Sequence, residues 1–377
     1  MGDRVLILGA GFGGLEVATL ISEGSGGAIE VVLLDAGEGF VFGFSKLELM
    51  FGRASVDRVR IPYASIEKPG VRWVRERITA IDPGALAVTT ERGSYEGDAM
   101  VIALGADYDF DATPGLVEAG NEFYSVAGAE RLAGILPGFA RGRVVVGVCG
   151  APFKCPPAPS ECALLLDDDL RDRGVREQCE ISFVIPFDRP VPPSPETSAA
   201  LESEFAERDI ELISGHRVAS LDGERGSAVL DDGAEIPFDL FLGVPRHRAP
   251  DVVVASGITE GGYVPVDPAT LRTTVPGVYA VGDVATAGVP KAGVFAEGAG
   301  RIVARALLAE LCDGEPPGRH LGQGTCYIEF GGGRVASVDI DFLSGPERTG
   351  TFNPASPRLA AEKEEFGASR RARWFGV

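Results

Sequence analysis

The chain has 377 residues, which at roughly 100 to 200 residues per domain predicts two or three domains with cores of their own. Its 35 Lys and Arg residues stand against 55 Asp and Glu residues, and the formal net charge of -20 argues against nucleic acid or anionic lipid as a partner. With 45% hydrophobic and 24% charged residues, and without the run of about 18 apolar residues that a membrane span needs, the composition excludes a transmembrane segment.

The first 35 residues predict a dinucleotide-binding βαβ unit. An apolar run over 4–8 precedes the glycine-rich GAGFGG, a helical pattern follows in LEVATLISEG, and a second apolar run over 29–34 ends in an acid. The glycines allow a tight turn and close approach of a pyrophosphate, the helix N-terminus stabilises its charge, and the acid is placed to accept ribose hydroxyls. The candidate cofactor-binding residues in this unit are Gly9, Gly11, Phe12, Gly13, Gly14 and Asp35.

A second, similar unit begins near residue 143. RVVVGVCG over 143–150 predicts a strand, a proline-rich loop follows, and a helix is expected from about Ser160, before another strand over 180–185. The prolines over 186–195 predict a rigid surface loop. We therefore expect an α/β fold with two Rossmann-like dinucleotide-binding domains of the FAD/NAD(P)-binding type.

The chain is expected to return to its first domain near residue 278. A short strand ends at Gly282-Asp283, and 301–311 predict an amphipathic helix. Alternation over 325–330 and 336–342 around a Gly-Gly-Gly turn then predicts a hairpin with one buried face. The expected domains are a FAD-binding domain over 1–106 and 251–318, a second Rossmann-like domain over 107–250, and a small C-terminal capping domain over 319–377.

Two further segments indicate which dinucleotide binds. MVIALGA over 100–106 and TVPGVYAVGD over 274–283 resemble the two motifs that follow the glycine turn in flavoproteins with two dinucleotide-binding domains. In that group the aspartate contacts the ribityl chain of FAD. Each motif alone fits a simpler reading, a buried strand ending at a glycine or a helix N-cap. The candidate cofactor residues added here are Ala103, Gly105, Gly282 and Asp283, and Ile78 is a further candidate outside both motifs.

The second unit departs from a nicotinamide-binding site. Where a second glycine fingerprint would stand, the sequence reads GVCGAPFKCPPAPSE over 147–161. Its prolines lack backbone donors, and Phe153 and Lys154 are bulky where a pyrophosphate needs close backbone approach. We therefore expect NADH to bind poorly.

The same stretch carries a specific resemblance. CGAPFKCPPAPSE, PKAGVFAEGAGRIVA from Pro290 and GTCYIEFG around Cys326 resemble the sulfide dehydrogenase flavoproteins, which comprise the sulfide:quinone oxidoreductases and the flavoprotein subunit of flavocytochrome c sulfide dehydrogenase. The resemblance implies an FAD-dependent enzyme that oxidises sulfide or a small persulfide and passes electrons to a quinone or another acceptor, with a homodimer as one possible assembly. It implies that Cys155 and Cys326 are a redox-active pair, that Glu161 transfers protons and that Lys291 lies near the isoalloxazine ring.

The sequence also departs from that family. The flavocytochrome subunit attaches FAD through a cysteine in the loop after the second strand, but the matching FVFGFSKLELMF from Phe40 has none, so we expect non-covalent FAD. The membrane-dipping C-terminal helices of many quinone-using relatives are not expected, because the chain stops just after Trp374-Phe375. No signal peptide is recognisable, which predicts a cytoplasmic protein, with peripheral contact at the inner membrane face left open.

Several alternatives remain open. From the residues alone, an inert buried thiol is the commoner interpretation of Cys155 and of Cys326, and Cys149 is a second possible partner for Cys155. The chain also fits a soluble NAD(P)H-dependent disulfide or quinone reductase, or a flavin-binding redox subunit that acts through a protein partner. The remaining cysteines and the three histidines match no metal signature and are interpreted as structural or surface residues: Cys162, Cys179, Cys312, His216, His247 and His320.

Overall fold

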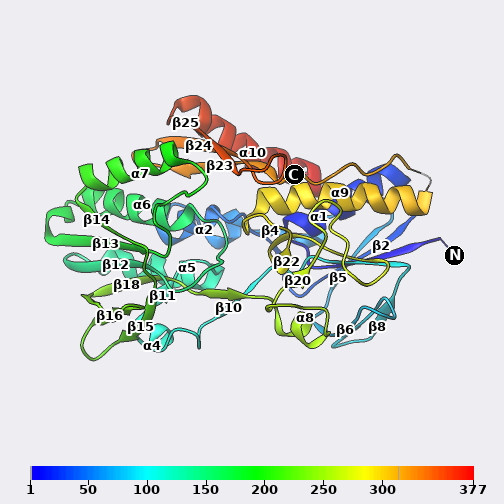
Figure 1. Ribbon diagram of the computed structural model, residues 1–377, viewed down its shortest axis with the longest axis horizontal. Coiled ribbons are helices and arrows are strands. Elements are labelled where there is room, and N and C mark those ends of the chain that lie inside the picture. Colours follow the sequence, from blue (N-terminus) through cyan, green and yellow to red (C-terminus); the bar gives the residue numbers. More distant parts are fainter. Residues whose placement is uncertain (1, 313) are drawn as a thin grey trace.

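The computed structural model describes residues 2–312 and 314–377. Figure 1 shows two α/β units side by side, with the C-terminal strands and helix lying across the top of both. Among the described residues, no helix is both long enough and apolar enough to pass through a membrane.

The first unit is built on a five-stranded parallel sheet with the strand order β21-β9-β1-β2-β5. All its central strands are apolar on both faces because helices and small hairpins cover both sides. The elements of this unit are β1 Arg4–Leu8, α1 Phe12–Ser25, β2 Glu30–Asp35, β3 Gly39–Phe40, α2 Ser45–Met50, α3 Val56–Val59, β4 Ile61–Pro62, β5 Val71–Arg75, β6 Ile78–Asp82, β7 Ala87–Thr90, β8 Ser94–Glu96, β9 Ala99–Ile102, α8 Asp251–Ala255, β20 Val264–Pro265, β21 Val278–Ala280, β22 Ala285–Thr286 and α9 Gly293–Cys312.

The second unit repeats this plan with the parallel order β11-β18-β12-β13-β14. A two-stranded antiparallel ribbon, β10 with β19, lies between the two units (Figure 1). The elements are β10 Asp107–Asp109, α4 Leu116–Ala119, β11 Asn121–Glu122, α5 Val126–Ile135, β12 Gly142–Val148, α6 Ala158–Asp172, β13 Cys179–Ile185, α7 Pro195–Glu207, β14 Ile210–Ser214, β15 Val218–Asp222, β16 Ser227–Leu230, β17 Glu235–Pro237, β18 Leu240–Val244 and β19 Arg246–Arg248.

The predicted α/β class with two Rossmann-like parallel sheets is confirmed. The chain returns to the first sheet as β21, which pairs with β9. After β21 a single 3₁₀ turn over Gly282–Val284 is followed by a short strand, so Asp283 does not begin an α-helix. The helix expected over 301–311 extends over α9 and begins at Gly293.

The C-terminal layer is an antiparallel sheet of β23 Gln323–Glu329, β24 Val335–Asp341 and β25 Thr349–Asn353, followed by the 19-residue helix α10 Pro357–Phe375. The alternating hairpin is present as β23 and β24, whereas the third strand and the helix go beyond the prediction. Ser356 caps α10 by accepting a hydrogen bond from the N–H of Leu359, and Pro357 occupies the first turn.

Helix α10 attaches the end of the chain to its beginning. Glu16 in α1 is fully buried and accepts hydrogen bonds from Trp374 Nε1 at 2.9 Å, Arg373 at 2.9 Å and Arg301 at 3.0 Å. Because a buried carboxylate is costly unless it is paired, the two donors from α10, Arg373 and Trp374, make this helix an integral part of the first unit, while Arg301 comes from α9. The Trp374 ring packs edge-on against Phe12, beside the glycine turn.

Candidate functional site

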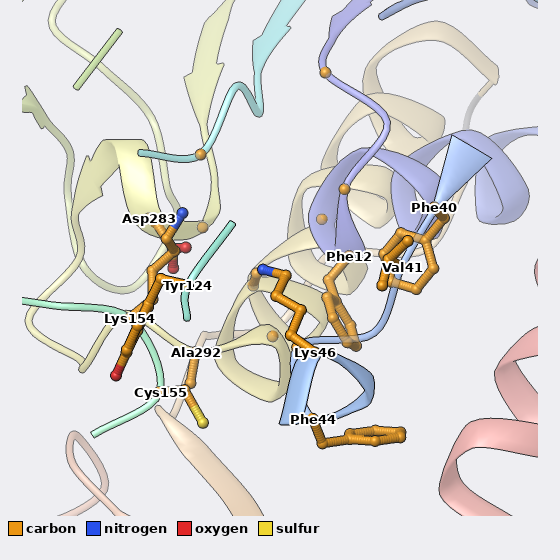
Figure 2. Close-up of a pocket in the computed structure, with 18 of the residues that line it drawn as sticks. Phe12, Phe40, Val41, Phe44, Lys46, Tyr124, Lys154, Cys155, Asp283 and Ala292 are labelled. Carbon is orange, nitrogen blue, oxygen red and sulfur yellow. The ribbon is translucent and has the colours of Figure 1, made fainter. Parts of the chain in front are cut away.

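A cavity of about 370 Å³ lies between the two units, and we call it the central cavity. Its walls come from the β1–α1 turn, the segment from the end of β3 to the first turn of α2, the loop between β12 and α6, and the beginning of α9. The strands β1, β2, β9 and β21 all end toward it, which is where open α/β sheets bind their ligands. Figure 2 shows Phe12, Phe44 and Lys46 on one side of this cavity, and Lys154, Cys155 and Asp283 on the other.

The glycine turn has the geometry of an anion cradle. Gly9 has φ +102°, and a Cβ there would lie 2.5 Å from the carbonyl oxygen of Ala103. A Cβ on Gly14 would lie 1.9 Å from the carbonyl oxygen of Gly9, whereas one on Gly11 would meet nothing within 4 Å and would occupy the approach to the turn. Helix α1 has no side-chain cap and no acid in its first turn. Its first N–H groups therefore remain available to a pyrophosphate.

Asp35 is held at the end of β2 by the neighbouring backbone. Its Oδ2 accepts a hydrogen bond from the N–H of Ala10 at 2.8 Å and its Oδ1 accepts one from Gly37 at 2.7 Å. Tyr63 fixes the same turn by donating to the carbonyl oxygen of Ala10 at 2.9 Å. Each carboxylate oxygen keeps a second lone pair, so Asp35 fits the predicted contact with ribose hydroxyls.

Three lysines surround Asp283 at the other end of the cavity. Lys291 donates to the carbonyl oxygen of Asp283 and lies 3.6 Å from the ring centroid of Tyr263, while Lys154 donates to the carbonyl oxygen of Ala106 at 2.8 Å. Burial, followed by the charge of Lys154, lowers the pKa of Lys46 to about 8. Burial raises the pKa of Asp283, and the lysine charges oppose that change. The cluster gives this end of the cavity a positive potential suited to an anionic group.

Cys155 lies in a strained and well-anchored loop beside these lysines. Its φ of 48° falls in the left-handed region, which for a non-glycine residue costs about 1–3 kcal/mol and persists only where neighbours enforce it. Its N–H donates to the carbonyl oxygen of Lys291 at 2.7 Å, and its carbonyl oxygen accepts from Ala158 at 2.9 Å. These bonds fix the thiol at the wall of the central cavity.

Glu161 lies in the first turn of α6 and lines the same cavity. Its Oε1 accepts a hydrogen bond from the N–H of Glu329 in β23 at 2.9 Å. Burial raises its pKa to about 7, even though Lys363 opposes this change. A carboxyl group with that pKa exchanges protons readily near neutral pH.

Cys326 lies in β23 and faces a second cavity of about 500 Å³, which we call the side cavity. The segment over 152–157 contributes to both cavities, as does Ala292: Lys154 and Cys155 line the central one, and Pro152, Phe153, Pro156 and Pro157 line the side one. Neither Cys155 nor Cys326 forms a disulfide in the structure.

The two thiols are electrostatically coupled. Burial raises the pKa of Cys155, and the charges of Glu161 and Cys326 raise it further. Burial raises the pKa of Cys326 to about 12, with Glu161 the next cause. Glu161 therefore lies within electrostatic reach of both thiols, and its protonation favours the thiolate of each.

The central cavity brings together most of the predicted site residues, namely Gly9, Gly11, Phe12, Gly13, Asp35, Ala103, Gly105, Cys155, Glu161, Gly282 and Asp283. Gly14 lies behind the turn, Ile78 is a core residue of β6, and Lys291 and Cys326 line the side cavity. The sequence reasoning missed Lys46, Tyr63 and Tyr124. A lone lysine in the apolar FVFGFSKLELM was the one available signal for Lys46. Within the described residues, no group of three or more His, Cys, Asp or Glu side chains is arranged to hold a metal ion.

Comparisons with known proteins agree with this geometry. Residues 3–300 match the family model of the pyridine nucleotide-disulphide oxidoreductases. The chain is 26% identical to the mitochondrial sulfide:quinone oxidoreductase of Mus musculus, over 94% of this chain and 82% of that protein. It is 27% identical to the alternative NAD(P)H-ubiquinone oxidoreductase C1 of Arabidopsis thaliana, over 61% of this chain and 47% of that protein. The solved sulfide:quinone oxidoreductase of Aquifex aeolicus has the same fold, with a TM-score of 0.88 and 22% identity, covering all of this chain and 92% of that one.

Proposed function

The chain belongs to the pyridine nucleotide-disulphide oxidoreductase family, and from that premise we propose that it is an FAD-dependent enzyme that oxidises sulfide or a small persulfide through Cys155 and Cys326. The predicted enzyme class, an oxidoreductase of this flavoprotein family, is confirmed by the family match and by the resemblance to sulfide:quinone oxidoreductases. The observation that carries the proposal is the position of Cys155: a strained, anchored thiol at the wall of the dinucleotide cavity, electrostatically coupled to Cys326.

The residues of the central cavity fit FAD. The uncapped start of α1 and the open space at Gly11 suit its pyrophosphate, Asp35 suits a ribose, and the cluster at Asp283 suits the ribityl and flavin end. When bound there, FAD supplies a two-electron acceptor beside Cys155. Among the described residues that line this cavity Cys155 is the one cysteine, which supports our expectation that FAD binds there without a covalent bond.

The two cavities suggest different roles for the two cysteines. In the oxidised enzyme Cys155 and Cys326 are joined, and HS⁻ attacks the sulfur of Cys326. The Cys155–Cys326 bond breaks, a bond forms between HS⁻ and Cys326, and Cys155 leaves as a thiolate. A second HS⁻ then removes the outer sulfur from Cys326 as HSS⁻, the Cys155–Cys326 bond re-forms, and the two electrons released would pass from Cys155, which faces the central cavity, to bound FAD.

Glu161 is the proposed proton carrier for these steps. It lies within electrostatic reach of both sulfurs, and its pKa of about 7 lets it take the proton from the attacking sulfur species near neutral pH. Its hydrogen bond from Glu329 fixes the carboxyl group while the proton moves.

The electron acceptor is a quinone or another oxidant, as the names of the relatives suggest. NAD(P)H reduction is the alternative activity, because some matched relatives carry it in their names. The loop over 152–157 argues against it, since its prolines lack the N–H groups that a second phosphate turn would use.

Anaerobic rapid mixing of the FAD-loaded protein separates the two activities. We expect sulfide to bleach the flavin absorbance within about a second, a time typical of turnover, and NADH or NADPH to do so far more slowly. Fast bleaching by NADH and none by sulfide would transfer the assignment to an NAD(P)H-dependent reductase.

A further inference from the structure

The hydroxyl group of Tyr124 is a buried donor that the fold leaves unused. Tyr124 lies just after β11 and lines the central cavity, and Figure 2 shows it on the same side of that cavity as Cys155. Its oxygen is shielded from solvent and forms no hydrogen bond with any residue that the structure describes. A buried hydroxyl group without a partner destabilises a protein, and such groups are rare in native structures. An unused donor in this position suggests a function beyond packing.

The rest of Tyr124 is held firmly in place. Its N–H donates to Glu122 Oε2 at 2.7 Å, and its carbonyl oxygen accepts a hydrogen bond from the hydroxyl group of Tyr108 at 2.8 Å. Its ring packs edge-on against His247, with the ring centroids 5.4 Å apart. Because both the backbone and the ring are fixed, the hydroxyl group can serve only the neighbours that it already has.

A cofactor in the central cavity is not one of these neighbours. Protein atoms cover the oxygen of Tyr124, so a group in the cavity meets the ring and not the hydroxyl. Burial raises the pKa of Tyr124 well above its usual range, and Cys155 is the first of the neighbouring charges that raise it further, ahead of Tyr108, Cys162 and Glu161. The partner is therefore a protein group, and Cys155 is the neighbour that acts on Tyr124 most strongly.

Cys155 needs such a donor whenever its sulfur is charged. Burial opposes the thiolate of Cys155, and so do the charges of Glu161 and Cys326. Two groups favour the thiolate, the N–H of Ala158 and, more weakly, the charge of Lys46. A hydrogen bond to a charged acceptor is stronger than one between neutral groups, so a third donor would add substantially to these two.

We propose that the hydroxyl group of Tyr124 stabilises the thiolate of Cys155 by donating a hydrogen bond to its sulfur. When HS⁻ bonds to Cys326, the Cys155–Cys326 bond breaks, both electrons of that bond stay on Cys155, and Tyr124 donates to the sulfur that leaves. The proton stays on the oxygen, because the raised pKa of Tyr124 keeps the group protonated. The inference rests on the proposed function, since it takes Cys155 to be the leaving thiolate.

Tyr124→Phe removes the hydroxyl group and keeps the ring. Alkylation of Cys155 by iodoacetamide, which reacts with the thiolate, is followed by peptide mass spectrometry on the FAD-loaded full chain with its thiols reduced and without sulfide. We expect alkylation of Cys155 to be about tenfold slower at each pH, as for loss of one hydrogen bond to a charged group, and alkylation of Cys326 to change little.

A spectroscopic reading of the same quantity does not depend on access of the reagent. A thiolate beside oxidised flavin gives a long-wavelength absorption band, and we expect Tyr124→Phe to weaken this band in the reduced-thiol enzyme by the same factor. The melting temperature should rise, because the variant loses an unpaired buried hydroxyl group. A residue that only packs would instead lower the melting temperature when altered.

Tyr95→Phe is the matched control. The hydroxyl group of Tyr95 donates to Glu76 Oε2 at 3.2 Å, and Tyr95 lines neither cavity. This variant should leave both the alkylation of Cys155 and the absorption band unchanged.

Three results would overturn the inference. The first is native alkylation of Cys155 and a native absorption band in Tyr124→Phe. The second is weaker FAD binding with unchanged alkylation, which would make the cofactor the partner. The third is an effect of Tyr124→Phe that disappears in a Glu161→Gln background, which would make Glu161 the partner.

These outcomes are separate from the test of the proposed function. If sulfide fails to bleach the flavin while Tyr124→Phe still slows alkylation of Cys155, the proposed activity is wrong and the role of Tyr124 stands. If sulfide bleaches the flavin and alkylation is unchanged, the proposed activity stands and the role of Tyr124 is wrong.

Discussion

Replacing Glu161 by Gln should stabilise the folded protein above neutral pH, and the size of the effect follows from burial. Burial raises the pKa of Glu161 from its ordinary 4.5 to about 7. Between these pH values the folded state holds a proton that the unfolded state has released, so the stability of the native protein falls as pH rises and then levels off above the folded-state pKa. The difference between the two pKa values corresponds to a loss of roughly 3 kcal/mol in the free energy of unfolding, at about 1.4 kcal/mol per pKa unit.

Gln removes that loss because it stays neutral and keeps an oxygen for the N–H of Glu329. Urea unfolding at about pH 5 and about pH 8 measures the effect, and we expect the variant to exceed the native protein by up to roughly 3 kcal/mol at the higher pH and by little at the lower. Glu364→Gln, at an exposed position of α10, is the control and should show no such difference. Equal gains at both pH values would refute the buried, proton-holding Glu161.

One treatment and three other variants test separate parts of the structure. Acid precipitation should release FAD into the supernatant, and colour that stays in the pellet would show covalent attachment. Gly11→Ala should cost little stability, because its Cβ meets no protein atom, but it should weaken FAD binding, because that Cβ would occupy the approach of the pyrophosphate to the turn. Gly9→Ala should instead impair folding, because its Cβ would lie 2.5 Å from the carbonyl oxygen of Ala103. Measurements of flavin content and melting temperature together separate these two outcomes. Trp374→Ala should cost about 3–5 kcal/mol in urea unfolding, since it removes a fully buried ring and a hydrogen bond to buried Glu16, and an unchanged midpoint would show that α10 does not stabilise the first unit.

The sequence was sufficient where local patterns determine structure. One cavity is lined by the glycine turn, by the acid at the end of β2, and by Ala103 and Gly282, which follow β9 and β21. These features meet because parallel strands end at the same edge of their sheet. The alternation of β23 and β24 likewise predicted the buried face that carries Cys326.

The remainder depends on contacts between distant segments. Helix α10 is mostly polar, and its position is set by the pairing of Trp374 and Arg373 with Glu16 at the other end of the chain, which no local pattern indicates. Lys46 approaches Cys155 from a different element, so its influence on that thiol appears only in the fold. The side cavity is assembled from three segments, and none of them alone predicts it.

The most direct test of the central claim is anaerobic mixing of sulfide with Cys155→Ser and Cys326→Ser, following flavin bleaching. We expect both variants to lose sulfide-dependent bleaching while keeping their FAD content and melting temperature, and Cys312→Ser, at an exposed position, to behave like the native protein. Near-normal bleaching in both Cys155→Ser and Cys326→Ser would contradict the proposed mechanism.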